Sequence, residues 1–148
     1  MSASAGQPGQ ISRDELVAVI ESIELETPRE RQNVLNCRAT LERLENDAEL
    51  FQDLLGFFFS DTPKLMADLR QAAATNDADL LRRAAHSLKG LISNFDAKDA
   101  AAIAFRLEAM SREDNLEDAA ATVDHLATEL ADVERLLKRF RVQQRKCG

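Results

Sequence analysis

Hydrophobic residues recur every three or four positions along most of the chain, which is the spacing that gives an α-helix one apolar face. In the last such stretch the spacing runs from Leu116 to Phe140, as helices of antiparallel bundles require. The pattern therefore predicts an all-α protein, an antiparallel four-helix bundle preceded by one or two short extra N-terminal helices. The helical stretches that we expect are residues 13–24, 33–45, 47–75, 78–95, 97–111 and 116–141.

Short polar residues mark where these helices begin and end. Ser12, with Glu15 three residues later, has the spacing of a capping box at the start of the first helix. Two Asn-Asp pairs, at 46–47 and 76–77, each break one helix and cap the next.

Pro63 interrupts the longest hydrophobic stretch. A proline in the interior of a helix costs about 3 kcal/mol, because it removes a backbone donor and clashes with the preceding turn. Two interpretations stay open: the helix kinks there, or Thr62 caps a new helix that has Pro63 at its first position.

The composition favours helices and one domain. The chain has 148 residues with no Trp, no Tyr, five Gly and three Pro, whereas sheets need aromatic residues and turn residues. We expect a disordered tail or cloning remnant over residues 1–10, an N-terminal helix and connector over 11–32, the bundle over 33–142, and a C-terminal tail over 143–148.

Charge and residue usage exclude several classes of function. Nineteen basic against 26 acidic residues give a net charge of −7, which argues against nucleic-acid binding. No apolar run approaches the roughly 20 residues of a membrane-spanning helix, and no secretory signal is visible. With two cysteines, Cys37 and Cys147, in no zinc-ligand spacing, we expect no membrane contact, no metal and a cytoplasmic location. No two glycines form a phosphate-binding loop, so we expect no nucleotide site.

His86 has an unusual position in its predicted helix. At about 100° per residue it falls at the centre of the polar face, opposite Leu81 and Leu88. An exposed imidazole is a competent nucleophile for phosphoryl groups, and nearby cations can stabilise the charge on the phosphoryl oxygens. From these residues alone, His86 is either a phosphoryl acceptor or an ordinary surface histidine. The residues within about 60° of it are Arg82, Arg83, Lys89, Gly90 and Ser93.

The second histidine, His125, lies beside the apolar stripe of the last helix, near Asp124 and Glu129. We interpret it as a surface histidine in acidic surroundings. A di-iron bundle site would need a glutamate three residues before a histidine, and positions 122 and 83 hold Thr and Arg. The sequence therefore predicts no metal site.

Residues 85–90, AHSLKG, match the AHxLKG signature of histidine-containing phosphotransfer (HPt) domains, which the chain resembles over about residues 33–141. Flanking segments resemble the family in the same order, among them Leu107-Glu108 at its recurring Leu-Glu. The chain departs from the family pattern where Asp96 replaces the usual Gly before Ala97, and where bulky residues follow Gly90.

The resemblance implies specific roles. His86 would accept a phosphoryl group from an aspartate of one receiver domain and pass it to another, and Lys89 would help to hold it. Leu88 would be core, and Gly90 would leave room for the receiver to dock. Such domains have no ATP site, no autokinase activity and no cofactor of their own, since Mg²⁺ is bound in the receiver. We expect a monomer that docks receivers through Arg82, Arg83, Ser87, Gly90 and Ser93.

Residues 11–20 resemble the last turn and final helix of a receiver domain, so the chain could be the C-terminal part of a hybrid sensor histidine kinase. The alternative is an ordinary extra helix packed on the bundle. Two alternatives for function also stay open: a helical docking module that binds a receiver or kinase without phosphotransfer, and a structural bundle that oligomerises through its N-terminal helices.

Overall fold

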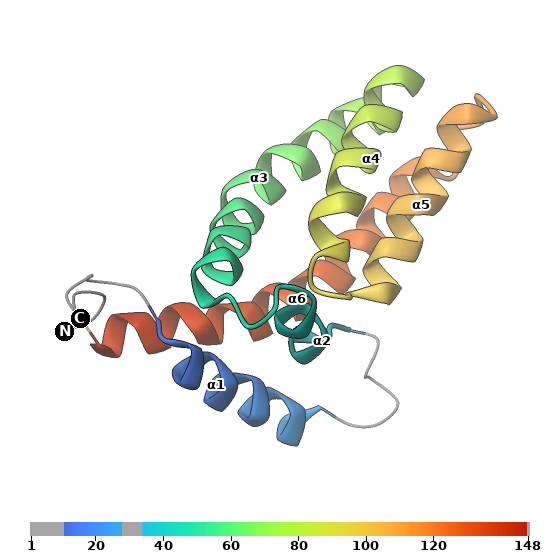
Figure 1. Ribbon diagram of the computed structural model, residues 1–148. Coiled ribbons are helices and arrows are strands. Elements are labelled where there is room, and N and C mark those ends of the chain that lie inside the picture. Colours follow the sequence, from blue (N-terminus) through green and yellow to red (C-terminus); the bar gives the residue numbers. More distant parts are fainter. Residues whose placement is uncertain (1–10, 28–33, 148) are drawn as a thin grey trace.

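The computed structural model describes residues 11–27 and 34–147, with side chains described as far as position 141. Its described residues form helices and no strands, which confirms the predicted fold class (Figure 1). None of the described helices is both long and apolar enough to cross a bilayer. The helices are α1 (Arg13–Glu26), α2 (Cys37–Arg43), α3 (Ala48–Thr75), α4 (Ala78–Ser93), α5 (Lys98–Arg112) and α6 (Ala119–Cys147).

Helices α3 to α6 form the four-helix bundle (Figure 1). Helix α4 packs between α3 and α5, and α6 packs against α3 and α5 from the other side. The C-terminal half of α6 continues past the bundle and packs on α1. The expected architecture, a bundle with short extra helices before it, is therefore confirmed.

Local chemistry sets most helix boundaries as the sequence predicts. The Ser12 hydroxyl accepts from the Glu15 backbone N–H, and the Glu15 carboxylate accepts from the Ser12 N–H, which completes the capping box. Asp47 and Asp77 cap α3 and α4 with their side chains. Asn76, with φ of 59°, ends α3 in the left-handed conformation that asparagine tolerates better than most residues.

Helix α3 runs through Pro63 without a break. The interpretation in which Thr62 caps a new helix is therefore wrong, while a kink at Pro63 stays a prediction. The Thr62 side chain is instead buried, and its hydroxyl has no hydrogen-bond partner.

Four phenylalanines form a buried cluster toward the end of the bundle where α3 begins and α4 ends. Phe51 and Phe58 from α3 each meet the ring of Phe95 edge-on with centroids 5.9 Å apart, and Phe51 lies 5.2 Å from Phe140 of α6. All four are fully buried. Edge-to-face pairs of this kind contribute about 0.5–1.5 kcal/mol beyond their buried area. Because Phe95 directly follows the last turn of α4, this cluster fixes where α4 ends.

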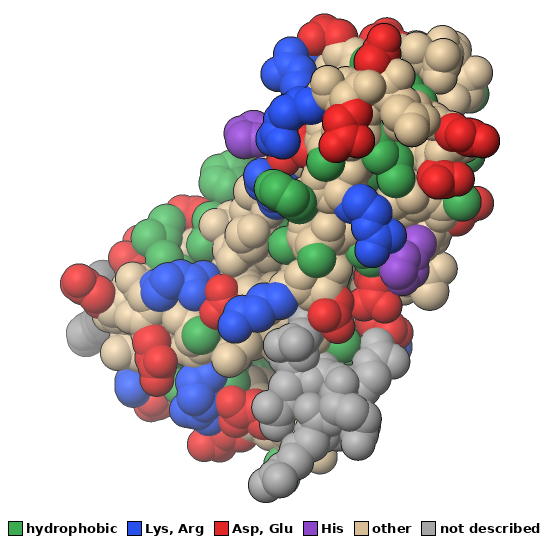
Figure 2. Space-filling view, turned by 90° about the vertical axis from the view of Figure 1, so that its right-hand side faces the viewer, with side chains coloured by type: hydrophobic (Ala, Val, Ile, Leu, Met, Phe, Trp, Pro, Cys, Tyr) green, Lys and Arg blue, Asp and Glu red, His purple; other side chains and the backbone are tan. Residues whose placement is uncertain are grey.

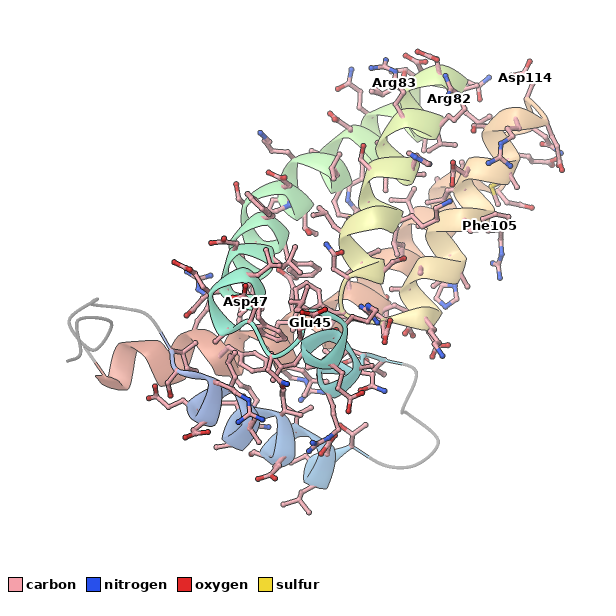
Figure 3. All side chains as sticks on the ribbon, viewed as in Figure 1. Glu45, Asp47, Arg82, Arg83, Phe105 and Asp114 are labelled. Carbon is pink, nitrogen blue, oxygen red and sulfur yellow. The ribbon has the colours of Figure 1, made fainter. Side chains whose placement is uncertain are left out.

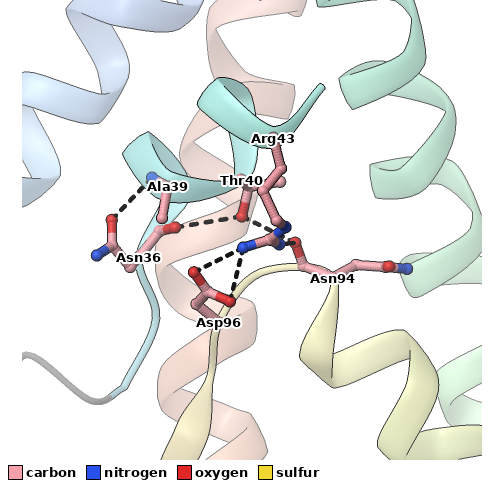
Figure 4. Close-up of polar contacts among 6 residues, drawn as sticks. All are labelled: Asn36, Ala39, Thr40, Arg43, Asn94 and Asp96. Atoms are coloured by element: carbon pink, nitrogen blue, oxygen red, sulfur yellow. Dashed lines mark hydrogen bonds and ion pairs between the residues drawn. The ribbon is translucent and has the colours of Figure 1, made fainter. Parts of the chain in front are cut away.

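The turn from α4 to α5 is tied to α2 by an arginine (Figure 4). Asp96, where the HPt family usually has glycine, has φ of 52°, a conformation that favours glycine. The Arg43 guanidinium donates to both Asp96 carboxylate oxygens at 2.9 Å, and it also donates to the Asn94 carbonyl at 2.9 Å. The Thr40 hydroxyl donates to the same carbonyl at 2.8 Å. Arg43 therefore offsets the strain that a non-glycine residue brings to this turn.

Helix α1 is fastened to the bundle by charge as well as by apolar packing. Arg139 of α6 binds Glu26 at 2.6 Å and also donates to the Ser22 hydroxyl. Arg38 of α2 forms a two-point contact with Glu24 at 2.8 and 2.9 Å. The predicted domain boundaries and the receiver-domain origin of residues 11–20 stay predictions, since packing on the bundle does not reveal where a helix came from.

Candidate functional site

His86 lies on the outer face of α4, and 70% of its side chain is exposed. The predicted core positions of this helix, such as Leu81 and Leu88, are fully buried on the opposite face. The helical spacing therefore orients His86 as the sequence predicts, with its imidazole ring accessible to a partner.

A carboxylate from the neighbouring helix holds the ring. Glu108 of α5 has only 5% of its side chain exposed, and its Oε2 lies 2.9 Å from Nδ1 of His86. Its Oε1 accepts a hydrogen bond from Nζ of Lys89 at 2.7 Å, and Arg112 approaches Oε2 at 3.4 Å. One buried carboxylate thus gathers three donors from α4 and α5.

Glu108 is ionised at neutral pH. Burial alone raises the pKa of its carboxyl, but the hydrogen bonds from Lys89 and His86 and the charge of these two residues outweigh burial, and the pKa falls below its ordinary value of 4.5. An ionised carboxylate only accepts hydrogen bonds. We therefore assign the proton of the neutral imidazole to Nδ1, which leaves the lone pair of Nε2 free.

Lys89 is held between Glu108 and an aromatic ring. Its Nζ lies 5.3 Å from the ring centroid of Phe105, a cation–π contact. Phe105 belongs to α5, and its side chain points away from the bundle (Figure 3). The ammonium group is therefore fixed beside His86 by two different contacts.

Arg82 and Arg83, which were predicted to dock the receiver, are exposed on α4 and pair with a neighbouring carboxylate. Both guanidinium groups bind the carboxylate of Asp79, at 2.8 and 3.0 Å, and no described contact joins either of them to the imidazole. Their hydrogen bonds hold the pKa of Asp79 below its ordinary value. Both arginines lie near the beginning of α4, on the side where Asp114 follows the end of α5 (Figure 3). The cations next to His86 are instead Lys89 and Arg112.

The other predicted docking residues, Ser87, Gly90 and Ser93, are all exposed on α4. A Cβ atom added to Gly90 would meet nothing within 4 Å. Glycine costs about 1 kcal/mol relative to alanine inside a helix. Because no internal contact requires glycine here, the open space outside Gly90 is available to a partner.

Sequence reasoning missed three residues of this site: Glu108, Arg112 and Phe105. Glu108 was noted only for its place in the Leu-Glu match, although its position carried a signal. Glu108 occupies one of the buried positions of α5, together with Leu107 and Ser111. A charged residue at a buried helix position needs hydrogen-bond or ion-pair partners. No comparable signal marked Arg112 or Phe105, because their roles depend on how α4 and α5 face each other.

The remaining candidates lie apart from this site. Within the described residues no group of three or more potential ligands could hold a metal ion. His125 is exposed on α6. Cys37 is buried, and burial raises the pKa of its thiol far above the ordinary value. The side chain of Cys147 lies outside the described residues.

Comparison with known proteins identifies relatives of the bundle. The family model of the Hpt domain matches residues 53–136, which include α4, α5 and most of α3 and α6. The crystal structure of histidine-containing phosphotransfer protein B (HptB) from Pseudomonas aeruginosa PAO1 superposes with a TM-score of 0.68 and 31% sequence identity. That match covers 74% of this chain and 95% of HptB. No curated protein sequence matches the chain significantly.

Proposed function

Since the chain belongs to the Hpt domain family, whose members carry phosphoryl groups and interact with receiver domains, we propose that His86 is its phosphoryl acceptor. The group would come from a receiver-domain aspartate and pass to another receiver domain. The observation that carries this proposal is the contact of 2.9 Å between Nδ1 of an exposed His86 and the buried Glu108 carboxylate. This contact supports Nε2 as the nucleophile, because Nε2 is the nitrogen left free.

The chemistry follows from this arrangement. The lone pair of Nε2 attacks the phosphorus of the aspartyl phosphate, an N–P bond forms, and the bond from phosphorus to the aspartate oxygen breaks. The aspartate leaves as a carboxylate. Because Nδ1 keeps its proton throughout, no proton moves, and the ring becomes cationic. The negative Glu108 stabilises that cation, and the reverse sequence returns the phosphoryl group to a second receiver.

Lys89 is placed to accompany the phosphoryl group. Its Nζ lies 2.7 Å from Glu108 and can turn toward oxygens on the phosphorylated ring without leaving the site. Arg112 adds a second positive charge. Around His86 the described residues offer a metal one carboxylate, Glu108, which already binds three donors. We therefore assign Mg²⁺ to the receiver partner and propose no cofactor, ATP site or autokinase activity for this chain.

The proposal is tested by incubating the chain with a radiolabelled phospho-receiver from the source organism. We expect the wild type to take the label in an acid-labile form, as for an N–P bond, and His86→Gln to take none. His125→Gln is the matched control, because it removes the other exposed histidine and should transfer normally. Radiolabelled ATP with Mg²⁺, in the absence of a receiver, should leave the chain unlabelled. Labelling that persists in His86→Gln would refute the proposal, and binding without transfer would favour the docking-module alternative.

A further inference from the structure

We propose that Phe105 is the apolar anchor on which the receiver domain docks, and that it contributes to affinity for the receiver. This inference rests on the proposed function of His86. Four large hydrophobic side chains are exposed in the described part of the chain: Leu25, Leu50, Phe57 and Phe105. Of these, Phe105 is the one with a described contact to a residue of the His86 site.

Phe105 lies within the area that a partner bound at His86 would cover. A standard protein interface buries about 800 Å² per partner, which corresponds to a disc of about 16 Å radius. The contacts that connect His86 with Phe105 are short. Nδ1 of His86 lies 2.9 Å from Oε2 of Glu108, and Oε1 of the same carboxylate lies 2.7 Å from Nζ of Lys89. Nζ in turn lies 5.3 Å from the centroid of the Phe105 ring. A receiver that brings its aspartate to Nε2 therefore reaches the ring.

The Phe105 ring is exposed and held in position before a partner binds. Phe105 is 52% exposed, so about half of an aromatic side chain faces water in the free protein. Lys89 holds the ring on one side, and phenylalanine has only two side-chain torsions to fix. Burial of a pre-positioned aromatic ring gains apolar contact at little entropic cost, and aromatic residues are enriched in interface cores.

Charge indicates what the occupant presents. Lys89 and Arg112 both bind the Glu108 carboxylate that contacts His86, and Figure 2 shows Lys and Arg side chains beside hydrophobic ones on the face that α5 lines. The fitting partner therefore carries carboxylates opposite His86 and an apolar side chain opposite Phe105. The carboxylate-rich phosphorylation pocket of a receiver supplies the first, and we infer that an apolar patch beside that pocket supplies the second.

The test measures transfer rates at increasing concentrations of the phospho-receiver that labels the wild type fastest. For Phe105→Ala we expect the half-saturating concentration to rise about 10-fold, whatever change in the maximal rate follows from the lost contact with Lys89. Titration with the unphosphorylated receiver should show the same loss of affinity. Phe105→Tyr keeps the ring and should restore binding. Leu25→Ala is the matched control, because it removes an exposed apolar side chain on α1, at the other end of the molecule (Figure 1).

Each outcome has one meaning. If the half-saturating concentration of Phe105→Ala and its affinity for the unphosphorylated receiver both stay within twofold of the wild type, the anchor role is refuted while phosphotransfer stands. If Leu25→Ala weakens binding as much, the effect is not specific to this site and the anchor role is again refuted. If the wild type takes no label from any receiver, the proposed function itself fails, and this inference fails with it. Circular dichroism of each variant establishes that it is folded.

Discussion

Glu108 binds its partners beside the middle of α4, and Asp96 binds its partner just past the end of α4. The two sites differ in whether a reactive atom stays free. Near the middle, Glu108 binds His86, Lys89 and Arg112 beneath an exposed imidazole. Past the end, Asp96 binds Arg43, which also donates to a neighbouring carbonyl (Figure 4). Both clusters join helices through charge-assisted hydrogen bonds. The first leaves a ring nitrogen free to react, whereas the second serves a backbone turn.

The two carboxylates also differ in how deeply they are buried. Glu108 is almost fully buried, with 5% of its side chain exposed, while 22% of the Asp96 side chain is exposed. A carboxylate is costly to bury, so its burial under a reactive group has to be matched by strong partners. We therefore expect substitutions in the Glu108 cluster to slow phosphoryl transfer, and substitutions in the Asp96 cluster to lower stability with little effect on transfer.

The largest effect should come from Glu108. Glu108→Ala removes the acceptor that fixes the Nδ1 proton and the charge that stabilises the phosphorylated ring, and we expect transfer to slow about 100-fold. Glu108→Gln retains an oxygen that can accept from Nδ1 but loses the charge, so we expect about a 10-fold loss. Rapid-quench measurement of transfer checks both values. Rates equal to that of the wild type in both variants would make Glu108 a structural residue like Asp96.

The sequence alone predicted the helical architecture and part of the candidate site. The outward orientation of His86 and the caps at Ser12 and Asp77 follow from periodicity and spacing, which are local properties. The ring-holding contact of Glu108 was missed because it joins α4 and α5, and 22 residues separate the two partners along the chain. The same holds for Arg43 and Asp96, which are 53 residues apart, so the reason that aspartate suits this turn is visible only in three dimensions.

Lys89→Ala should have the next largest effect, with transfer about 10-fold slower, because the phosphorylated ring loses an adjacent positive charge. The fold should stay intact, since Glu108 keeps His86 and Arg112 as partners when Lys89 is removed. Transfer kinetics together with helical circular dichroism check this prediction. Loss of helicity would mean that Lys89 supports the bundle rather than the chemistry.

Arg43→Ala should reverse the pattern. It removes the hydrogen bonds to Asp96 and Asn94, and we expect the free energy of unfolding to fall by about 1–2 kcal/mol while transfer stays within twofold of the wild type. Urea denaturation measures the loss. Arg70→Ala is the matched control, because its single exposed contact with Asp124 should contribute less than 1 kcal/mol. Equal losses in the two variants would show that Arg43 does not brace the turn.

The smallest effect concerns pH. Because the pKa of Glu108 is lower in the folded chain than its ordinary value of 4.5, the ionised carboxylate contributes stability above that value. This contribution is lost as the pH falls below 4.5 and through the lower pKa of the folded state. The difference in unfolding free energy between the wild type and Glu108→Gln should therefore shrink as the pH falls below 4.5. A difference that grows on acidification would give the pKa shift the opposite sign.

We propose that Glu108 holds the proton of His86 on Nδ1, so that Nε2 receives the phosphoryl group. Nitrogen-15 NMR of the two ring nitrogens tests it directly, on the wild type before and after transfer from a phospho-receiver. We predict the Nδ1–H tautomer in the free protein and a phosphoryl group on Nε2, with the Nδ1–H preference weakened in Glu108→Ala. A phosphoryl group on Nδ1, or an Nε2–H tautomer in the free wild type, would contradict the claim.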